Sequence, residues 1–386
     1  SLQWVKFSEL AWKPDSSGFY YSRFPEPAAG EEFQSLNYNQ SLHFHKIGAP
    51  QDQDTLVYAR PAQPEVMITG AVAADRYLMI YMSVGTDAAY EIAVQDLQDA
   101  TAQPVMLIEG FKDEYYFIGA EDRVLFAVTN NNATRKRIVA IDLDNPHADN
   151  WREVVPESDS VLMGASMVGG KLITGYMEDV KTVMLVYAID GSNPQELNLP
   201  GIGTAGGFDG TPEDTETFYS YSSFNAAPTI YRYDIASGTS EIFKQPALPF
   251  DPSSYVVKQV FYPSKDGTSI PMFITYRDDL NLDNGAPTLL YGYGGFDISL
   301  PPEFSIANFA WMDMGGVYAV ANLRGGGEYG KAWHDAGRLL EKQNVFDDFI
   351  AAGEYLIAEG YTTTAQLAIH GRSNGGLLVG AVVNQR

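Results

Sequence analysis

The sequence contains no cysteine among its 386 residues. Without thiols, the chain forms no disulfide bonds, uses no thiolate nucleophile and builds no zinc site on cysteine ligands. The absence does not identify the compartment, because a chain without cysteine tolerates oxidising and reducing surroundings alike. We therefore leave the compartment open between the cytoplasm and a periplasmic or secreted location.

Long apolar runs and basic charge are also scarce. No run approaches the roughly 20 apolar residues of a membrane span, and the N-terminus lacks the basic and apolar segments of a signal peptide. Lysine and arginine number 25 against 49 acidic residues, which gives a net charge of −24. Nucleic-acid binding requires a basic face. We therefore expect a soluble protein, monomeric, with neither a nucleic-acid nor a membrane partner.

The residues that are present can build a large core. Apolar residues make up 45% of the chain and aromatic residues 13%, which is typical of a folded globular protein. A length of 386 residues exceeds one ordinary core and favours two domains. We place them at residues 1–251 and 252–386, where the pattern of the sequence changes.

Residues 1–251 are predicted to form short strands without helical periodicity. A unit recurs every 45–60 residues or so, with a polar turn, an apolar strand, a charged turn and a closing strand that contains aspartate. Turn and first strand occupy residues 14–21, 74–80, 121–126, 169–174 and 212–219, and the closing strands 93–97, 139–143, 186–190 and 231–235. The spacing suits five blades of a β-propeller. An irregular β-sandwich is the alternative, but it gives no reason for five similar units.

Residues 252–386 follow a different pattern. A hairpin is expected around the turn 264–268, followed by a strand at 287–291, a helix near 304–314 and a strand at 317–322. An amphipathic helix capped by Asn344 and a further strand come next. Alternation of strands and helices after a hairpin indicates an α/β sheet, here its first half.

Ser373 lies in the sequence G-R-S-N-G at residues 371–375, between an apolar strand and an apolar helix. A strand, a G-x-S-x-G turn and a helix form the nucleophile elbow of α/β-hydrolases. The turn exposes the serine hydroxyl and directs the N–H of Asn374 toward an oxyanion on the substrate. The alternative is an ordinary glycine-rich turn in which the serine caps the helix.

The loop after the third expected strand reads G-Y-G-G-F at residues 292–296. In α/β-hydrolases this loop supplies the second oxyanion donor. Tyr293 can donate its phenolic O–H there, and Phe296 would offer an aromatic wall to the substrate. A plain tight turn carrying a core phenylalanine is the alternative.

The other candidate sites are weaker. His43 and His45 alternate on a strand with no third ligand nearby, so we expect no metal site. His370 is interpreted as a packed or edge residue of its strand. The G-x-G-x-x-G at residues 325–330 is also found in dinucleotide sites. It lies in mid-sheet and lacks an acidic ribose partner, so we interpret the loop as structural or as lining the active site. We expect no cofactor.

Four motifs together resemble the prolyl oligopeptidase family. They are Y-G-Y-G-G-F at 291–296, N-L-R-G-G-G-E-Y-G at 322–330, K-Q-N-V-F-D-D-F at 342–349 and G-R-S-N-G-G at 371–376, with F-Y-P-S-K-D-G-T at 261–268 beside them. The resemblance is dense from residue 255 onward and continuous through the repeats. It implies a seven-bladed propeller, of which about five blades would lie here, followed by the first half of an α/β-hydrolase domain.

The resemblance also implies an activity: hydrolysis of short peptides on the carboxyl side of proline through an acyl-enzyme, with no metal or cofactor. Ser373 would be the nucleophile, and the Tyr293 O–H and Asn374 N–H would form the oxyanion hole. Phe296 would line the proline pocket, with Ile298 close by. The catalytic aspartate and histidine are expected beyond residue 386, so these 386 residues alone should not hydrolyse peptides at an enzyme-like rate.

Two alternatives stay open from sequence. A sister peptidase of the same architecture would cut after a residue other than proline. A non-catalytic propeller that binds peptides, with a vestigial hydrolase half, would need no base for Ser373.

Overall fold

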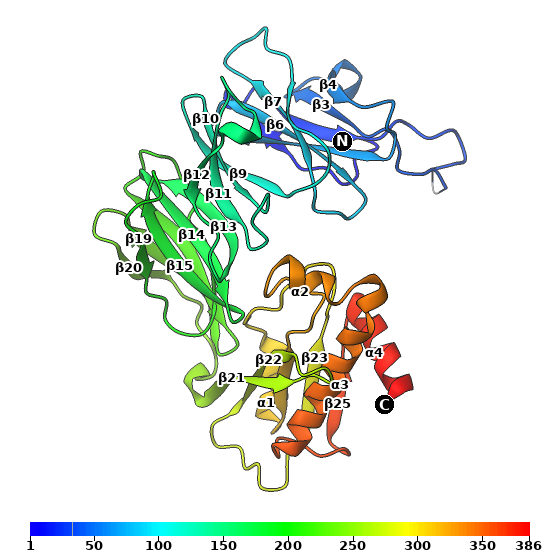
Figure 1. Cartoon of the computed structure of the whole chain (residues 1–386), viewed down its shortest axis with the longest axis vertical. Helices are drawn as coiled ribbons and strands as arrows, with labels where there is room; N and C mark the ends of the chain where they lie inside the picture. Colours follow the sequence, from blue (N-terminus) through cyan, green and yellow to red (C-terminus); the bar gives the residue numbers. More distant parts are fainter. Residues whose placement is uncertain (33) are drawn as a thin grey trace. The chain divides into compact units, whose positions relative to one another are not determined.

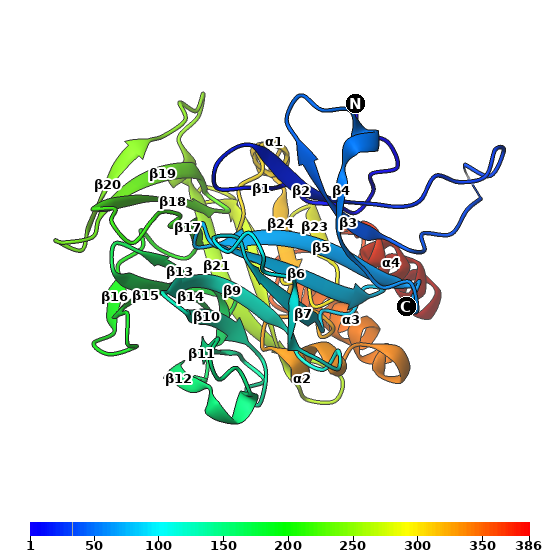
Figure 2. The same cartoon turned by 90° about the horizontal axis from the view of Figure 1, so that it is seen from above.

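The computed structural model describes residues 1–32 and 34–386. Within them, strands β1 to β20 form five four-stranded sheets, and successive strands pair antiparallel in each (Figures 1 and 2). The first three sheets comprise β1 (Ala11–Trp12), β2 (Gly18–Arg23), β3 (Ser41–Lys46), β4 (Thr55–Ala59); β5 (Val66–Ala73), β6 (Tyr77–Val84), β7 (Glu91–Asp96), β8 (Val105–Ile108); and β9 (Tyr115–Glu121), β10 (Val124–Thr129), β11 (Arg137–Asp142), β12 (Arg152–Val155). The next two comprise β13 (Val161–Val168), β14 (Lys171–Glu178), β15 (Lys181–Ala188), β16 (Gln195–Leu197); and β17 (Thr204–Gly207), β18 (Glu216–Ser223), β19 (Ala226–Asp234), β20 (Thr239–Lys244). Five such meanders confirm the predicted propeller blades.

One detail of the predicted repeat is wrong. The strand that we expected to close each unit is the third of four, as in β7 and β11. The fourth strands are only 3–6 residues long and mostly half-exposed or exposed. A short edge strand buries few side chains, so it leaves little alternation to detect in the sequence.

The chain divides into two compact units, Ser1–Pro156 and Glu157–Arg386. The first unit holds three sheets, and the second holds two sheets and an α/β part. The boundary that we placed between residues 251 and 252 stays a prediction. In the described residues, no helix combines the length and the apolar character needed to cross a bilayer.

The α/β part is built on one five-stranded sheet in the order β21-β22-β24-β23-β25. Its strands are β21 (Tyr255–Pro263), β22 (Ser269–Arg277), β23 (Thr288–Gly292), β24 (Val317–Ala321) and β25 (Leu367–His370). Its helices are α1 (Ile306–Asp313), α2 (Lys331–Asp335), α3 (Gln343–Ala358) and α4 (Asn374–Gln385), and the chain also has 3₁₀ turns η1 (Gln51–Gln53), η2 (Ala148–Asn150), η3 (Pro252–Ser254) and η4 (Leu339–Glu341). The predicted hairpin and strand–helix alternation are confirmed.

The register of the parallel strands determines where the site can form. Strand β23 lies between β24 and β25 and is parallel to both. Tyr291 on β23 is directly opposite His370 on β25, so the two strands end at the same level of the sheet. The loops that follow β23 and β25 therefore leave the sheet side by side.

Helix α3 covers the sheet through a buried face that includes Val345, Phe349 and Leu356. The prediction that Asn344 caps this helix is wrong. Helix α3 begins at Gln343, and the Asn344 side chain donates to the carbonyl oxygen of Ala336 at 2.9 Å. Asparagine is a common capping residue, but here its amide fastens the preceding loop instead.

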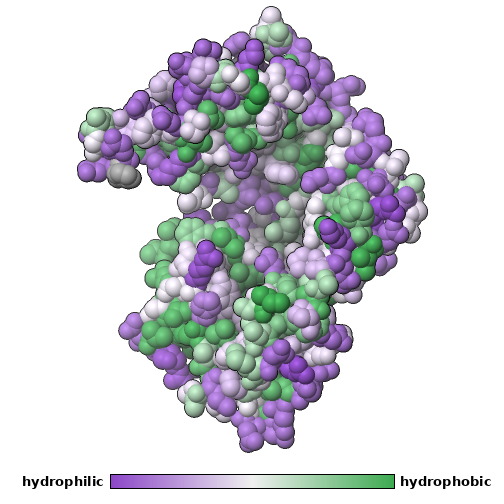
Figure 3. All heavy atoms as spheres, turned by 180° about the vertical axis from the view of Figure 1, so that it is seen from behind, coloured by the Kyte–Doolittle hydropathy of each residue, from purple (hydrophilic) through white to green (hydrophobic). Residues whose placement is uncertain are grey.

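Helix α4 and the segment before α3 leave apolar side chains exposed. Leu377 and Val383 on α4 are 57% and 61% exposed, and Leu340 is 97% exposed. Figure 3 shows, in green, where hydrophobic residues reach the surface of the molecule as seen from behind the view of Figure 1. Helix α4 follows the edge strand β25, and its outer face carries the exposed Leu377 and Val383.

Within the second unit, the sheets β13–β16 and β17–β20 pack on the α/β sheet. The rings of Phe224 and Phe273 pack at a tilted angle with their centroids 5.4 Å apart, in a buried cluster that includes Val180 and Val320. The backbone carbonyl of Asp179, in the turn between β14 and β15, accepts a hydrogen bond from the side-chain amide of Gln259. Apolar packing and polar contacts thus fix this turn against the α/β part.

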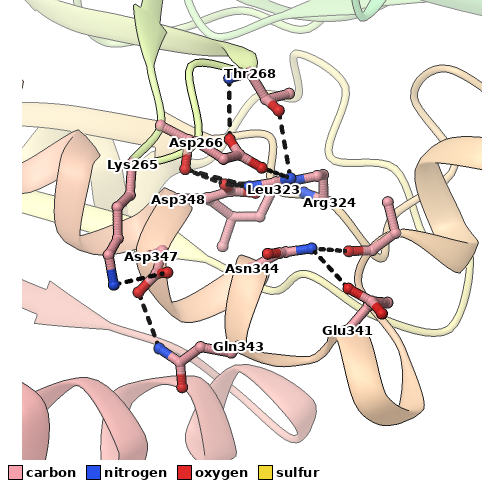
Figure 4. A network of polar contacts seen from close by, with 12 residues as sticks. Lys265, Asp266, Thr268, Leu323, Arg324, Glu341, Gln343, Asn344, Asp347 and Asp348 are labelled. Atoms are coloured by element: carbon pink, nitrogen blue, oxygen red, sulfur yellow. Dashed lines mark hydrogen bonds and ion pairs between the residues drawn. The ribbon is translucent and has the colours of Figure 1, made fainter.

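A buried ion pair joins three segments of the α/β part (Figure 4). The Arg324 guanidinium donates to both carboxylate oxygens of Asp348 on α3, at 2.6 to 3.2 Å, and to Asp266 at 2.5 Å. Ser264 donates its hydroxyl to the same Asp348 carboxylate at 2.6 Å. Arg324 follows β24, and Ser264 and Asp266 lie in the β21–β22 turn, so the pair fixes the β24 loop between the hairpin and α3.

Removing one partner of this pair should destabilise the α/β part strongly. We expect Asp348→Ala to lower the free energy of unfolding by about 3–5 kcal/mol, because it leaves the Arg324 charge buried without its main partner. The matched control is Asp335→Ala, which removes an exposed partner of Lys331 and should cost at most about 1 kcal/mol. Urea unfolding measures the free energy of unfolding of both variants. It is followed by the fluorescence of Trp311 and Trp333, in a background where the other three tryptophans are replaced by phenylalanine. Equal losses in the two variants would contradict the assignment.

Candidate active site

Ser373 occupies a sharp turn between β25 and α4. Its φ and ψ angles are 56° and −118°, a combination that costs energy for any residue with a side chain and that persists where the surroundings impose it. The side chain is exposed, and its hydroxyl has no hydrogen-bond partner within residues 1–32 and 34–386. The strand–turn–helix predicted from G-x-S-x-G is present, with the hydroxyl accessible.

The two glycines of the motif are required by close backbone contacts. A Cβ atom at residue 371 would collide with the carbonyl oxygen of Gly375. A Cβ atom at Gly375 would lie 2.7 Å from the carbonyl oxygen of Gly292, at the end of β23. The second contact shows that the turn is packed directly against the neighbouring glycine-rich loop.

A hydrogen bond joins the loop after β23 to the start of α4. The Asn374 side-chain amide donates to the carbonyl oxygen of Tyr293 at 2.6 Å. Gly295 lies against the same amide, since a Cβ atom there would be 2.5 Å from the Asn374 Nδ2. The absence of a side chain at residue 295 is what permits this approach.

The backbone N–H of Asn374 and the phenol of Tyr293 are both available as donors. Asn374 is the first residue of α4, so its N–H has no acceptor within the helix, and the helix dipole favours negative charge at this end. The Tyr293 side chain is half-buried, and in the described part of the chain its O–H bonds to nothing. Ser373 and these two donors thus lie on adjacent segments.

Phe296 and Ile298 are exposed on the continuation of the β23 loop, at 60% and 47%. The backbone beneath them is fixed, because Asp297 N–H donates to the Gly325 carbonyl at 3.1 Å and Ile298 N–H to the Gly295 carbonyl at 3.1 Å. Phe296 has a positive φ of 56°, uncommon for an aromatic residue. The loop presents two apolar side chains to solvent on a held backbone.

The glycines at residues 325–330 serve this arrangement. A Cβ atom at Gly325 would lie 2.9 Å from the Gly294 carbonyl oxygen, so the loop packs against the segment that carries Tyr293. The helix that follows it, α2, has only five residues. These contacts support the structural interpretation of the loop over a dinucleotide site.

His334 contacts these loops, because its Nδ1 lies 3.1 Å from the backbone nitrogen of Asp297 and 2.8 Å from the carbonyl oxygen of Gly325. His370 is exposed on β25, with its ring 5.4 Å from that of Tyr291. On β3, His43 contacts the Ser41 hydroxyl at 3.0 Å and His45 contacts the Asp54 carboxylate at 2.7 Å. Among residues 1–32 and 34–386, no three His, Asp or Glu side chains gather as metal ligands.

Two charged residues beside the site were not singled out from sequence, Lys342 and Glu328. Glu328 is buried, and its Oε1 accepts from the Leu300 N–H at 3.2 Å and the Asn322 amide at 3.4 Å. Its Oε2 has no partner among the described residues. Burial raises the pKa of Glu328 to about 7. A charged residue inside a glycine-rich motif was the signal that could have marked it.

Comparison with known proteins gives a consistent result. A family model described as the N-terminal β-propeller domain of prolyl oligopeptidase matches residues 1–246, and one described as the prolyl oligopeptidase family matches residues 302–386. A prolyl endopeptidase of Elizabethkingia miricola is 41% identical over 382 residues, and one of Dictyostelium discoideum 37% over 415.

Solved structures agree. A structure from a study of two prolyl endopeptidases superposes with a TM-score of 0.92 at 39% identity, covering 100% of this chain and 56% of the other. A mutant of prolyl oligopeptidase B from Galerina marginata, bound to a 35mer hydrolysis and macrocyclization substrate, gives 0.92 at 32% identity, covering 99% and 54%. The sequence matches cover 99% and 100% of this chain but 54% of each relative, so the chain spans about half the length of the curated relatives it matches.

The protonation of Glu328 should make the stability of the α/β part depend on pH. The pKa is raised from 4.5 to about 7 by burial, so the folded chain retains a proton that the unfolded chain releases. This stabilisation is complete below pH 4.5 and is lost as the pH rises through 7. A shift of this size corresponds to about 3 kcal/mol.

We expect the difference in unfolding free energy between the wild-type chain and Glu328→Gln to fall by that amount between pH 4.5 and 8. Glutamine carries no ionisable proton, so the variant lacks this pH-dependent term. The control Glu359→Gln changes an exposed glutamate on the same part of the chain. Urea titrations at several pH values, followed by Trp311 and Trp333, give the curves. If the unfolding free energies of Glu328→Gln and the wild-type chain change in parallel between pH 4.5 and 8, Glu328 does not hold the proton.

Proposed function

The chain belongs to the prolyl oligopeptidase family, and from this membership we propose that the whole protein is a serine endopeptidase that hydrolyses short peptides on the carboxyl side of proline. The observation that carries the proposal is Ser373, exposed at a strained turn whose neighbouring loop is bonded to Asn374. The names of its relatives support the preference for proline. We keep the division into residues 1–251 and 252–386 as the domain boundary of the proposal, and a monomer as its oligomeric state.

In the proposed reaction, the Ser373 hydroxyl attacks the carbonyl carbon of the scissile bond and gives its proton to a histidine. The carbonyl oxygen becomes an oxyanion that accepts from the Tyr293 O–H and the Asn374 N–H. The bond to the leaving amine then breaks as the histidine protonates it, which leaves an acyl-enzyme that water hydrolyses by the same route. We propose that the histidine and its aspartate lie in the part of the protein that residues 1–386 do not span.

The substrate would contact the loop after β23. Phe296 offers an exposed aromatic face, and Ile298 an exposed aliphatic side chain two residues later. A proline ring is apolar and rigid, so it packs on such surfaces at little entropic cost. We assign both residues to the proline pocket, whose remaining walls would come from the rest of the protein.

Labelling with a fluorophosphonate tests the nucleophile in the full-length protein. We expect modification at Ser373, found by mass spectrometry of the digested protein, and loss of at least about 10³-fold in kcat/KM in Ser373→Ala. The exposed serine at residue 237 provides the matched control, since Ser237→Ala should change neither readout. Modification elsewhere, or a fully active Ser373→Ala, would refute the assignment.

Substrate preference distinguishes this proposal from a sister peptidase. With two peptides that differ only in proline or arginine before the scissile bond, we expect the proline peptide to have the higher kcat/KM by about 10²-fold or more. A preference for arginine would assign the protein to a relative with another specificity. Binding of the peptides without cleavage of either would instead favour the non-catalytic propeller.

A further inference from the structure

Lys342 lies beside the Ser373 turn although it comes from a different segment, between η4 and α3. Its side chain is half-buried. The ammonium donates to the carbonyl oxygen of Gly294 at 2.6 Å and contacts the Asn374 side-chain oxygen at 3.4 Å. One cation thus bonds to both loops that carry the proposed oxyanion donors.

The position is electrostatically unfavourable for a lysine. Burial lowers the pKa of Lys342, and in the described part of the chain no carboxylate lies within ion-pair distance of it. It also precedes the first residue of α3, where the helix dipole disfavours positive charge. Since the side chain makes no capping bond to α3, stabilising that helix does not account for it.

The contacts of Lys342 continue into a chain of three groups. Lys342 contacts the side-chain oxygen of Asn374, and the amide nitrogen of the same side chain donates to the Tyr293 carbonyl at 2.6 Å. The residues held in this way are the two that carry the proposed oxyanion donors, the Tyr293 O–H and the Asn374 N–H. Hydrogen bonds in series polarise one another, so the cation strengthens the link as well as completing it.

We propose that Lys342 is a positioning residue for the oxyanion hole, which fixes the loop after β23 against the start of α4 and places an uncompensated positive charge beside the developing oxyanion. The inference rests on the proposed function. A charge on a half-buried side chain with few nearby anions interacts more strongly with a developing anion than a fully solvated charge does. Its contribution should therefore appear in the transition state and leave substrate binding nearly unchanged.

The experiment uses the full-length protein and three variants. Lys342→Met removes the charge and the donors but keeps an unbranched side chain, and Lys342→Arg keeps a cation that can reach a carbonyl oxygen. Lys331→Met is the matched control, because Lys331 is an exposed lysine on the nearby helix α2. The readouts are kcat and KM for a proline peptide, with the affinities for a peptide aldehyde and for the corresponding alcohol.

We expect Lys342→Met to lower kcat about 10- to 100-fold, less than the loss of a direct oxyanion donor, with KM within about threefold of wild type. Lys342→Arg should recover part of the loss, and Lys331→Met should behave as wild type. The Ser373 hydroxyl adds to the aldehyde carbon and forms a hemiacetal with a charged oxygen. The alcohol has no carbonyl group and cannot form this adduct. In Lys342→Met, the affinity for the aldehyde should fall in proportion to kcat, and the affinity for the alcohol should stay within about threefold of the wild-type value.

An unchanged kcat, or an equal fall in aldehyde and alcohol affinity, would overturn the proposal. Hydrogen exchange of the backbone amides of Gly294, Gly295 and Asn374 provides a readout without turnover. We expect exchange to be faster in Lys342→Met than in Lys331→Met, and equal rates would overturn the positioning role. If the wild-type protein neither cleaves peptides nor is labelled at Ser373, the proposed function fails, and the exchange rates still decide whether Lys342 holds the loops.

Discussion

The parallel pairing of β23 with β25 is the constraint on which the candidate site depends. Because Tyr291 is opposite His370, the segments that follow leave the sheet at one level and at neighbouring positions. Their backbones can then approach until Gly375 lies against the Gly292 carbonyl, and the Asn374 amide can bond to Tyr293. A shift of one residue in this register would separate the serine turn from the loop that is proposed to stabilise the oxyanion.

Buried polar contacts then hold the surrounding segments in place. The Arg324–Asp348 pair fastens the β24 loop to α3 and to the first hairpin, and the same loop packs through Gly325 on the segment that carries Tyr293. A buried ion pair seldom adds net stability over apolar packing. Its directional bonds do specify one geometry, which is the requirement where an oxyanion must find two donors at fixed positions.

Much of this could be predicted from sequence because the signals are local. The glycines and serine at residues 371–375 define their own turn, and the apolar alternation of the middle strands defines the blades. Contacts between distant segments leave no such trace. Lys342 meets Gly294 across 48 residues, and Arg324 meets Asp266 across 58, so neither role is visible in a window of sequence. The short fourth strands were missed because they bury few side chains and so show little alternation. The true start of α3 was missed because the Asn344 amide bonds to the Ala336 carbonyl instead of capping the helix.

The loop at residues 322–330 shows how these long-range contacts combine. Glu328 accepts from Leu300, at the end of the segment that exposes Phe296 and Ile298, and the adjacent Tyr329 donates its hydroxyl to the Asp179 carboxylate at 3.1 Å. Two consecutive side chains therefore connect the proposed substrate loop to the β14–β15 turn within the same compact unit. The Leu300 N–H and the Asp179 carboxylate are thus held by adjacent residues of one loop. The glycines that precede Glu328 allow the close packing. The hydrogen bonds of the Glu328 and Tyr329 side chains fix the orientation of the loop.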